Sequence, residues 1–142
     1  MAKEKLPGLG NIMPRFPELD SEPFWQATKR HELRYQQCDH CDGVIFYPRR
    51  HCVHCTSLEI SAKISKGEGE VYTYSVLRKS QNPDFKGLVP YWIAWVDLDE
   101  GFRILTHIVG VDEAEGPLKI GQRVAVEWED CEDIAFPVFR AI

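Results

Sequence analysis

The sequence lacks three features that define large classes of proteins. It has no apolar run long enough to cross a bilayer, so we expect no membrane partner. It has no excess of Lys and Arg, because 22 acidic residues outnumber 17 basic ones and the formal charge is −5. This balance argues against a large nucleic-acid surface. Its first residues lack the charged and apolar regions of a secretory leader, which favours a cytoplasmic location.

Signatures of catalysis are missing as well. There is no Gly-x-Ser-x-Gly, no Gly-rich phosphate loop and no His-Glu-x-x-His. His107 lies in an expected strand, where a structural role is more common than a role as a base. Asp97, Asp99 and Glu100 form a charged turn. The residues give no positive reason to expect activity from this chain alone, so we predict no catalytic residue.

Cysteine is scarce, but four of the five cysteines form two Cys-x-x-Cys pairs. Each pair can present two thiolates to one metal ion from a tight turn. The two pairs together predict a tetrahedral structural zinc site, and the same thiolates would also suit a single iron, as in rubredoxin. The proposed ligands are Cys38, Cys41, Cys52 and Cys55.

Other uses of these cysteines fit less well. Two structural disulfides are typical of small secreted domains, and this chain is long enough to bury a core. A redox dithiol would open a helix in a βαβ unit, but here the pairs flank a strand-like run, residues 44–47. His40, His51 and His54 lie among the cysteines and are expected to face solvent. Four thiolates leave no open coordination position, so the metal would support the fold rather than react.

The chain divides into three expected segments. Residues 1–19 are rich in Pro and Gly and predict an extended arm, in which Ile12, Met13 and Phe16 are either partner contacts or part of a loose tail. Residues 20–57 predict a short helix from about residue 22 to 30, followed by the zinc ribbon. Residues 58–142 alternate apolar and polar side chains in short runs separated by turns, which predicts a barrel.

The expected barrel has five or six strands and no long internal helix. A five-stranded OB barrel fits this number and length, so the fold class is mainly β. The run 91–98 is apolar on both faces and should be central, whereas Pro137 should place the last strand at an edge. The expected strands are residues 58–65, 70–79, 91–98, 102–109, 123–129 and 135–141.

The order of these motifs resembles the zinc-ribbon plus OB-fold family of acyl-CoA-associated proteins, from about residue 22 to the C-terminus. One departure is that Asp42 and Thr56 stand where this family usually has a glycine after each cysteine pair. The matching pieces are Phe24-Trp25, both cysteine pairs with Pro48-Arg49 between them, Gly67-Glu-Gly-Glu-Val-Tyr72, Pro90-Tyr91, Val96-Asp-Leu-Asp-Glu-Gly101 and Ile120-Gly121.

The resemblance implies a non-catalytic accessory subunit of a thiolase-fold enzyme that acts on bulky acyl-CoA substrates, aromatic or steroid. Such a subunit shapes the acyl-CoA channel and stabilises its partner, with a coenzyme A thioester as the ligand of the complex. The reaction can be thiolysis, condensation, acyl transfer or aldol cleavage. A nucleic-acid-binding ribbon and OB module is the alternative, and an independent acyl-CoA enzyme is a third possibility. Candidate CoA or partner contacts are Phe24, Trp25, Arg49, Arg50, Asn82 and Phe85.

Overall fold

The computed structural model describes residues 20–83, 85–112 and 114–142, and the arm predicted over residues 1–19 lies outside them. The described chain begins with helix α1, Glu22–Thr28, which has Pro23 in its first turn. The helix ends earlier than the sequence pattern predicts. The backbone of His31 adopts a φ of 58°, and the Ala27 carbonyl accepts hydrogen bonds from the N–H groups of Arg30 and Glu32. The chain therefore turns out of the helix and enters the first strand.

A three-stranded antiparallel sheet follows the helix, with the strand order β2-β1-β3. Its strands are β1 (Arg34–Cys38), β2 (Val44–Ile45) and β3 (Ile60–Ile64). Strand β3 differs from the sequence prediction, which grouped residues 58–65 with the barrel. It pairs with β1 over five residues instead, from Arg34↔Ile64 to Cys38↔Ile60. Alternation predicts that a strand forms, but it does not identify the strand's partner.

The remaining strands close into a five-stranded barrel with the order β4-β5-β6-β8-β7. The strands β4, β5 and β6 form a meander, and the hairpin β7–β8 returns so that β8 lies parallel to β6. This arrangement is an OB-fold, as predicted. The bounds are β4 Glu68–Leu77, β5 Tyr91–Leu98, β6 Arg103–Val109, β7 Arg123–Cys131 and β8 Ile134–Ala141.

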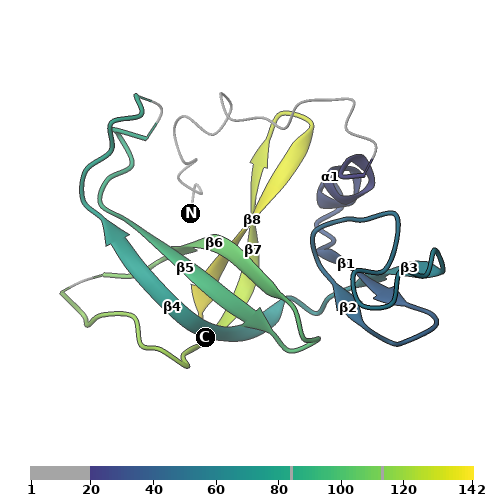
Figure 1. Ribbon diagram of the computed structural model, residues 1–142. Coiled ribbons are helices and arrows are strands. Elements are labelled where there is room, and N and C mark those ends of the chain that lie inside the picture. The colour runs from purple at the N-terminus through teal and green to yellow at the C-terminus, as the bar shows by residue number, and fades with distance from the viewer. Residues whose placement is uncertain (1–19, 84, 113) are drawn as a thin grey trace.

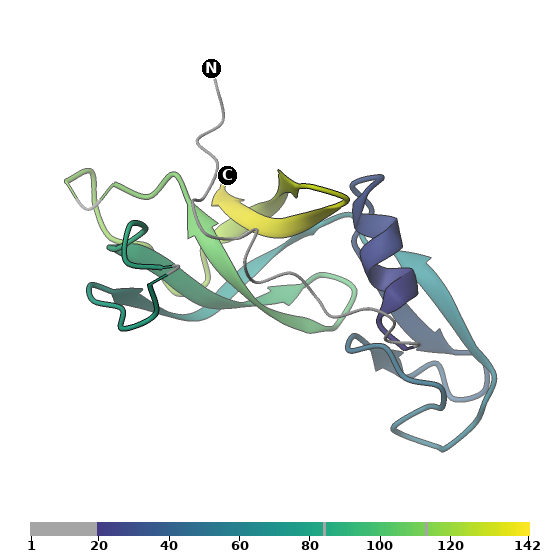
Figure 2. The same cartoon turned by 90° about the horizontal axis from the view of Figure 1, so that it is seen from above.

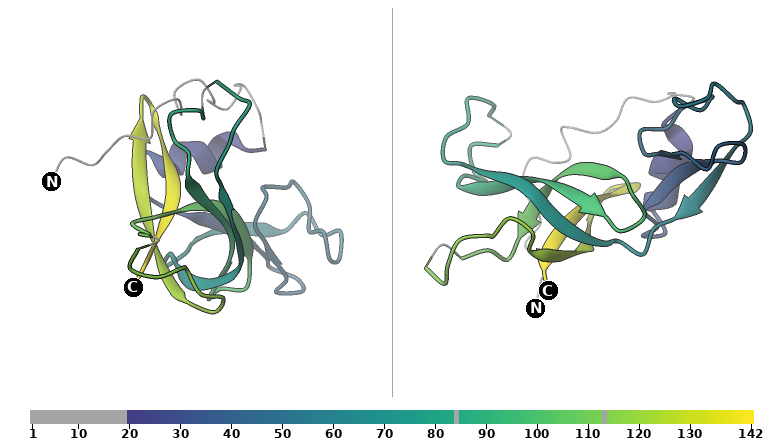
Figure 3. Two further views of the ribbon diagram at one scale, coloured as in Figure 1. Left: turned by 90° about the vertical axis from the view of Figure 1, so that its left-hand side faces the viewer. Right: turned by 60° about the horizontal axis from the view of Figure 1, so that its bottom comes forward.

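The ribbon sheet and α1 lie together at one end of the barrel, and the loop between β4 and β5 rises at the other end (Figures 1 and 3). Glu100, in the β5–β6 turn, holds the linker between the two parts. Its carboxylate accepts hydrogen bonds from Ser65 Oγ at 2.7 Å and from the Lys66 N–H at 2.8 Å. The turn that the sequence places at residues 99–101 therefore also fixes the position of the ribbon.

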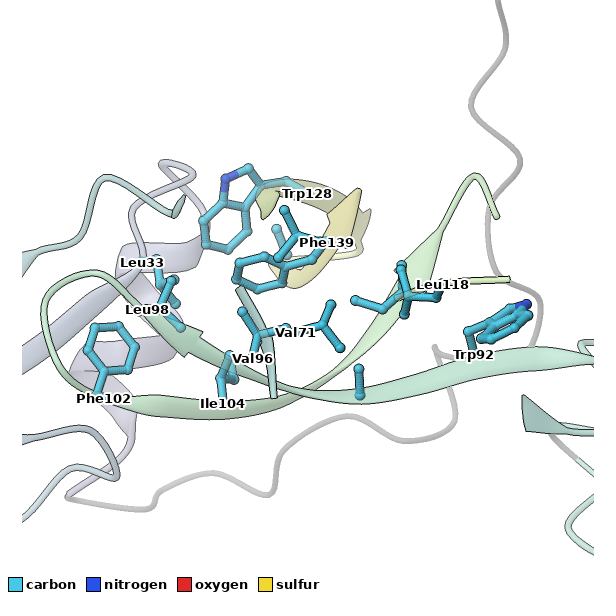
Figure 4. Packing of buried hydrophobic residues seen from close by; sticks show 14 residues of the cluster. Leu33, Val71, Trp92, Val96, Leu98, Phe102, Ile104, Leu118, Trp128 and Phe139 are labelled. Carbon is cyan, nitrogen blue, oxygen red and sulfur yellow. The ribbon is translucent and has the colours of Figure 1, made fainter. Parts of the chain in front are cut away.

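The barrel core is continuous along the whole barrel (Figure 4). Trp92 and Leu118 lie at one end, and Leu33 and Phe102 lie at the end that faces the ribbon. Strand β5 supplies alternate buried residues and has β4 and β6 as its neighbours, so it is central, as predicted. The Phe102 ring also stacks on two rings of the ribbon part, with centroid distances of 5.1 Å to Tyr35 and 4.8 Å to Phe46. Stacked aromatic rings therefore join the two parts.

Strand β8 is not a free edge, although its proline predicted one. It pairs with β7 along its whole length, but with β6 only at Phe139 and Arg140. Pro137 falls where β6 and β8 have separated, so its missing N–H costs no ladder bond on that side. The Pro137 carbonyl accepts a hydrogen bond from Thr106 Oγ1 at 3.0 Å across the separation. Within the described ranges, no helix is both long and apolar enough to cross a membrane.

Candidate functional site: a cysteine cluster and an apolar groove

The four paired cysteines come together at the tip of the ribbon sheet. Their Sγ atoms all lie within 4.8 Å of one another, and two pairs, Cys38–Cys55 and Cys41–Cys52, are 3.6 Å apart. A tetrahedral zinc with Zn–S bonds of ~2.3 Å separates its sulfur atoms by about 3.8 Å. The residues present therefore fit one zinc ion with four thiolate ligands, and such an ion would supply folding stability rather than chemistry.

Backbone N–H groups point at the sulfur atoms and favour their thiolate form. Cys38 Sγ accepts from the N–H groups of Cys41 and His40, each at 3.4 Å, and these contacts hold the pKa of Cys38 below its usual value. Burial raises the pKa of Cys52, but the N–H groups of His54 and Cys55 outweigh it and lower that pKa to about 7. One cysteine of each pair is thus favoured as a thiolate. The Gly43 N–H lowers the pKa of Cys41, but burial and the neighbouring cysteine side chains outweigh it and raise that pKa to about 12, and the pKa of Cys55 is also raised. Metal binding requires all four thiols to lose their protons.

The turns after the cysteine pairs keep their geometry without the usual glycine. Asp42 and Thr56 adopt φ values of 60° and 67°, the left-handed conformation that glycine enters most easily. Gly43 is needed for a different reason, because a Cβ there would lie 2.4 Å from the His54 ring. That ring is placed by the Val44 carbonyl, 3.1 Å from its Nε2 atom. His40, His51 and His54 are all exposed, so the predicted solvent-facing histidines are confirmed.

An apolar groove of about 380 Å³ lies where α1, the ribbon and the barrel meet. Its floor is the region in which β6 and β8 separate, and its walls come from the helix, the segment after β2 and the loop after β4. Figure 2 shows the backbone arrangement, in which α1 lies beside the β7–β8 hairpin. Two of the predicted contact residues, Phe24 and Trp25, line one wall, and a third, Phe85, reaches it from the loop. The other lining residues are Ser21, Phe46, Tyr47, Pro48, Ile104, Leu105, Thr106, His107, Phe136, Pro137 and Val138.

Aromatic contacts hold the helix wall of the groove in place. The Phe24 ring meets those of Trp25 and Phe46 edge to face, at 5.0 and 5.8 Å between centroids. Trp25 meets Phe136 of β8 in the same way at 5.6 Å. Edge-to-face pairs have a preferred geometry, so the groove wall is fixed by packing.

A row of rings connects the groove with the loop after β4. The rings of Phe85 and Tyr91 are 5.8 Å apart, and those of Tyr91 and His107 are stacked at 4.9 Å. Burial lowers the pKa of His107, so its ring is neutral near neutral pH. His107 is thus an uncharged polar residue of the groove floor under these conditions.

The other predicted contact residues do not line the groove. Arg50 forms an exposed ion pair with Asp20, with 2.8 Å between Nε and Oδ1. The backbone of Arg49 exchanges two hydrogen bonds with the side chain of Gln36. Asn82 lies in the loop turn, where its carbonyl accepts from the Phe85 N–H. These three residues stay predictions for contacts outside the groove.

Sequence reasoning missed the barrel side of the groove. Leu105 is 46% exposed and occupies an outward position of an alternating strand. Nothing in the sequence distinguishes it from an ordinary surface residue. Phe136 and Pro137 carried one usable signal, because a proline in a strand indicates a missing neighbour. That signal predicted a free edge. Strand β8 is instead paired with β7 throughout and lacks its β6 neighbour only around Pro137, beside the groove.

Comparison with known proteins agrees with this architecture. Residues 25–61 match the family model described as the rubredoxin-like zinc ribbon domain of ChsH2, and residues 63–129 match the C-terminal OB-fold domain of ChsH2. A solved structure described as an Ltp2-ChsH2(DUF35) aldolase superposes with a TM-score of 0.78 at 30% identity, covering 90% of this chain and 98% of that one. The chain is a zinc-ribbon and OB-fold protein, and it belongs to the DUF35 family of ChsH2-type proteins.

Curated relatives with functional names include two hydratase alpha subunits, one of them a probable enoyl-CoA hydratase alpha subunit of Thermomonospora curvata that is 34% identical over 119 residues, or 82% of this chain and 36% of the relative. The other is the 3-oxo-4,17-pregnadiene-20-carboxyl-CoA hydratase alpha subunit of Mycobacterium tuberculosis, which is 34% identical over 115 residues, or 80% of this chain and 35% of the relative. A further relative is a DUF35 domain-containing scaffold protein of Methanothermobacter thermautotrophicus, 31% identical over 100 residues, or 68% of this chain and 71% of the relative. The chain spans about a third of the length of the hydratase alpha subunits that it matches.

Proposed function

We propose that this chain is an accessory subunit of a thiolase-fold enzyme complex that acts on bulky acyl-CoA substrates. The observation that carries the proposal is the apolar groove, because an exposed apolar surface of this kind usually marks a site that binds a partner protein or a ligand. The family adds support. Relatives of this chain are named as a CoA-ester hydratase subunit, as a scaffold protein and as part of an aldolase with a second component.

The groove has the size and character of a site for an apolar group. Ligand pockets for small molecules usually measure about 300–1,000 Å³ and have mostly apolar walls with a few polar groups. Here the volume is about 380 Å³, and the polar groups at the floor are Thr106 and His107. We propose that the groove covers the acyl end of the substrate channel once the partner is bound.

In the proposed mechanism, this chain positions the substrate and takes no chemical part in the reaction. The partner supplies the nucleophile and the bases, and this chain holds the acyl group and excludes water from it. The ribbon and its metal keep Phe46 and Tyr47 in the groove wall, so the metal acts at a distance from the chemistry. A cytoplasmic location is part of the proposal, since thiolates held by a metal suit a reducing compartment.

Co-expression with a candidate thiolase-fold partner from the same organism tests the proposal. We expect a stable heteromer that buries more than ~2,000 Å² and turns over acyl-CoA only when both chains are present. Two proteins that elute separately, with full activity in the partner alone, would overturn it.

A pair of variants tests the groove itself. Trp25→Ala should weaken assembly or raise KM for a bulky acyl-CoA, because the ring forms part of the wall. Tyr72→Ala is the matched control, since Tyr72 is also aromatic, is 51% exposed and lies outside the groove. Equal effects of the two changes would argue against the groove.

A further inference from the structure

The floor of the apolar groove holds a polar side chain whose hydrogen-bonding atoms are uncommitted. Within the described chain, no group forms a hydrogen bond with either ring nitrogen of His107, although the residue lines the groove and is half-buried. The hydroxyl group of Thr106 beside it is already in use, because it donates to the Pro137 carbonyl at 3.0 Å. No fully buried side-chain nitrogen or oxygen atom of the described residues lacks a partner, so the ring nitrogens of His107 remain accessible. A ligand in the groove can therefore bond to them.

Stacking fixes the orientation of this ring before any ligand binds. The imidazole of His107 lies 4.9 Å from the Tyr91 ring between centroids, with 23° between their planes, and Tyr91 in turn contacts Phe85 at 5.8 Å. One face of the imidazole is thus covered, which leaves its other face and the edge that carries the nitrogens for a ligand. A side chain that is already held in place loses little conformational freedom on binding.

The surroundings of His107 define the kind of group that fits. Burial lowers the pKa of His107, so the ring is uncharged near neutral pH and carries one N–H donor and one acceptor nitrogen. It can therefore bond to a hydroxyl group or to a keto oxygen. The described lining contains no Lys or Arg, so a carboxylate would be buried there without a permanent opposite charge. Much of the lining is aromatic and suits a flat ring: Phe24, Trp25, Phe46, Phe85 and Phe136.

We infer that His107 determines the specificity of the groove by forming a hydrogen bond with an uncharged oxygen substituent, hydroxyl or keto, on a flat apolar ring. That this ring belongs to an acyl group rests on the proposed function, whereas the selection of the oxygen rests on the groove alone. The bond discriminates because an oxygen that leaves water for apolar walls loses its water partners and needs a replacement. A ring without the oxygen gains nothing from His107.

Amide NMR of the isolated chain measures this selection with small probes and detects weak binding. Toluene and p-cresol differ by one hydroxyl group, and isopropylbenzene and acetophenone differ mainly by a keto oxygen. We expect all four to shift the floor amides of residues 104–107, 136 and 138. His107→Phe keeps a flat ring beside Tyr91 but removes both nitrogens. It should lower the preference for p-cresol over toluene by about fivefold, the effect of one net hydrogen bond, and leave the affinity for toluene unchanged.

Further variants separate the hydrogen bond from other causes. His107→Gln restores a donor and an acceptor, so it should recover part of the preference. His107→Leu repeats the loss with a smaller side chain, in case the phenyl ring disturbs the floor. Tyr47→Phe is the matched control, since it removes the hydroxyl group of another groove residue, which is 56% exposed, and should leave the preference unchanged. An unchanged preference for the oxygen-bearing probe of both pairs in the Phe and Leu variants, or a loss in Tyr47→Phe instead, would refute the inference.

This experiment and the heteromer experiment fail separately. An active heteromer whose small subunit shows no preference dependent on His107 would keep the proposed function and refute the selection. A preference dependent on His107 in a chain that forms no heteromer would keep the site and refute the proposed function. A partner side chain that fills the groove in the heteromer and blocks every probe would overturn the assignment of the ring to an acyl group.

Discussion

Thr28 joins helix α1 to the barrel through a single hydroxyl group. The residue is fully buried, its Oγ1 donates to the Trp25 carbonyl at 2.6 Å, and the same oxygen accepts from the Ala135 N–H at 3.2 Å. Thr28→Val keeps the shape but leaves a buried N–H unpaired. We expect it to lower the free energy of unfolding by about 1–3 kcal/mol, measured by urea denaturation.

The control for this change is Thr28→Ser. Serine keeps the hydroxyl group and loses only a methyl group, so it should cost less than the valine variant. If the serine and valine variants are equally destabilised, packing rather than the hydrogen bond holds the helix.

His107 should make stability depend on pH. Burial lowers its pKa from an ordinary value of 6.5, so the unfolded chain binds a proton more readily than the folded chain. Stability is therefore complete above pH 6.5 and falls as the pH falls from there through the lowered pKa. We expect His107→Gln, which does not titrate, to show a shallower loss of stability in this window.

Urea denaturation at each pH gives the free energy of unfolding of the unmodified chain and of His107→Gln, and the two values are compared. The zinc ribbon is the same in both, so the acid sensitivity of its thiolates cancels in the difference. A difference in stability that does not change between pH 7 and pH 5 would show that His107 has no part in the pH dependence.

The ribbon is the element whose stability should depend on metal. Its buried residues are few, mainly Cys38, Ile45 and Cys52, so its own core is too small to fold without help. We expect one zinc per chain by elemental analysis, and loss of it when Cys38→Ser and Cys52→Ser are combined. The melting temperature should then fall by more than about 5 °C.

Cys131→Ser is the matched control, because Cys131 lies in β7 and outside the cluster of four. It should keep the zinc and most of the stability. Unchanged metal content in the double variant would show that the four cysteines are not the ligands, and iron in place of zinc would correct the metal while keeping the site.

It is easier to predict from the sequence which residues form strands than which strands pair with one another. Strand β5 was identified as central because apolar residues on both faces need cover on both faces, and β4 and β6 provide it. Strand β3 was identified as a strand but assigned to the barrel, since alternation is the same in either sheet. The cysteine pairs were found because their spacing alone defines a chelating turn, whatever surrounds them.

Only some of the groove residues could be predicted, because the closure of the barrel brings them together. The sequence predicts contacts at Phe24 and Trp25, adjacent aromatic residues on a short helix, and lists Phe85 among the candidate contacts. Their common location depends on where β6 and β8 separate, which is a property of barrel closure. Only Pro137 gives a local signal of that separation, and nothing in the pattern around residue 105 does.

At the scale of the whole molecule, charge is distributed in a way that disfavours binding to nucleic acid. Exposed arginines on the barrel form bidentate pairs with carboxylates, as Arg123 does with Asp99 at 2.6 and 2.7 Å. Arg103 is similarly engaged by Asp97 and Tyr72 on the face of β4 to β6. That face offers rings for stacking, but its cations are already neutralised.

We therefore expect only weak, salt-sensitive attraction to a mixed single-stranded oligonucleotide at physiological salt. A backbone-tracking groove releases counterions in proportion to the phosphates it neutralises, and arginines already paired with carboxylates, such as Arg103, Arg123 and Arg140, can neutralise few of them. Fluorescence anisotropy at low and physiological salt measures both the affinity and the salt slope. Micromolar or tighter binding at physiological salt, with a steep slope, would favour the nucleic-acid module over the acyl-CoA subunit.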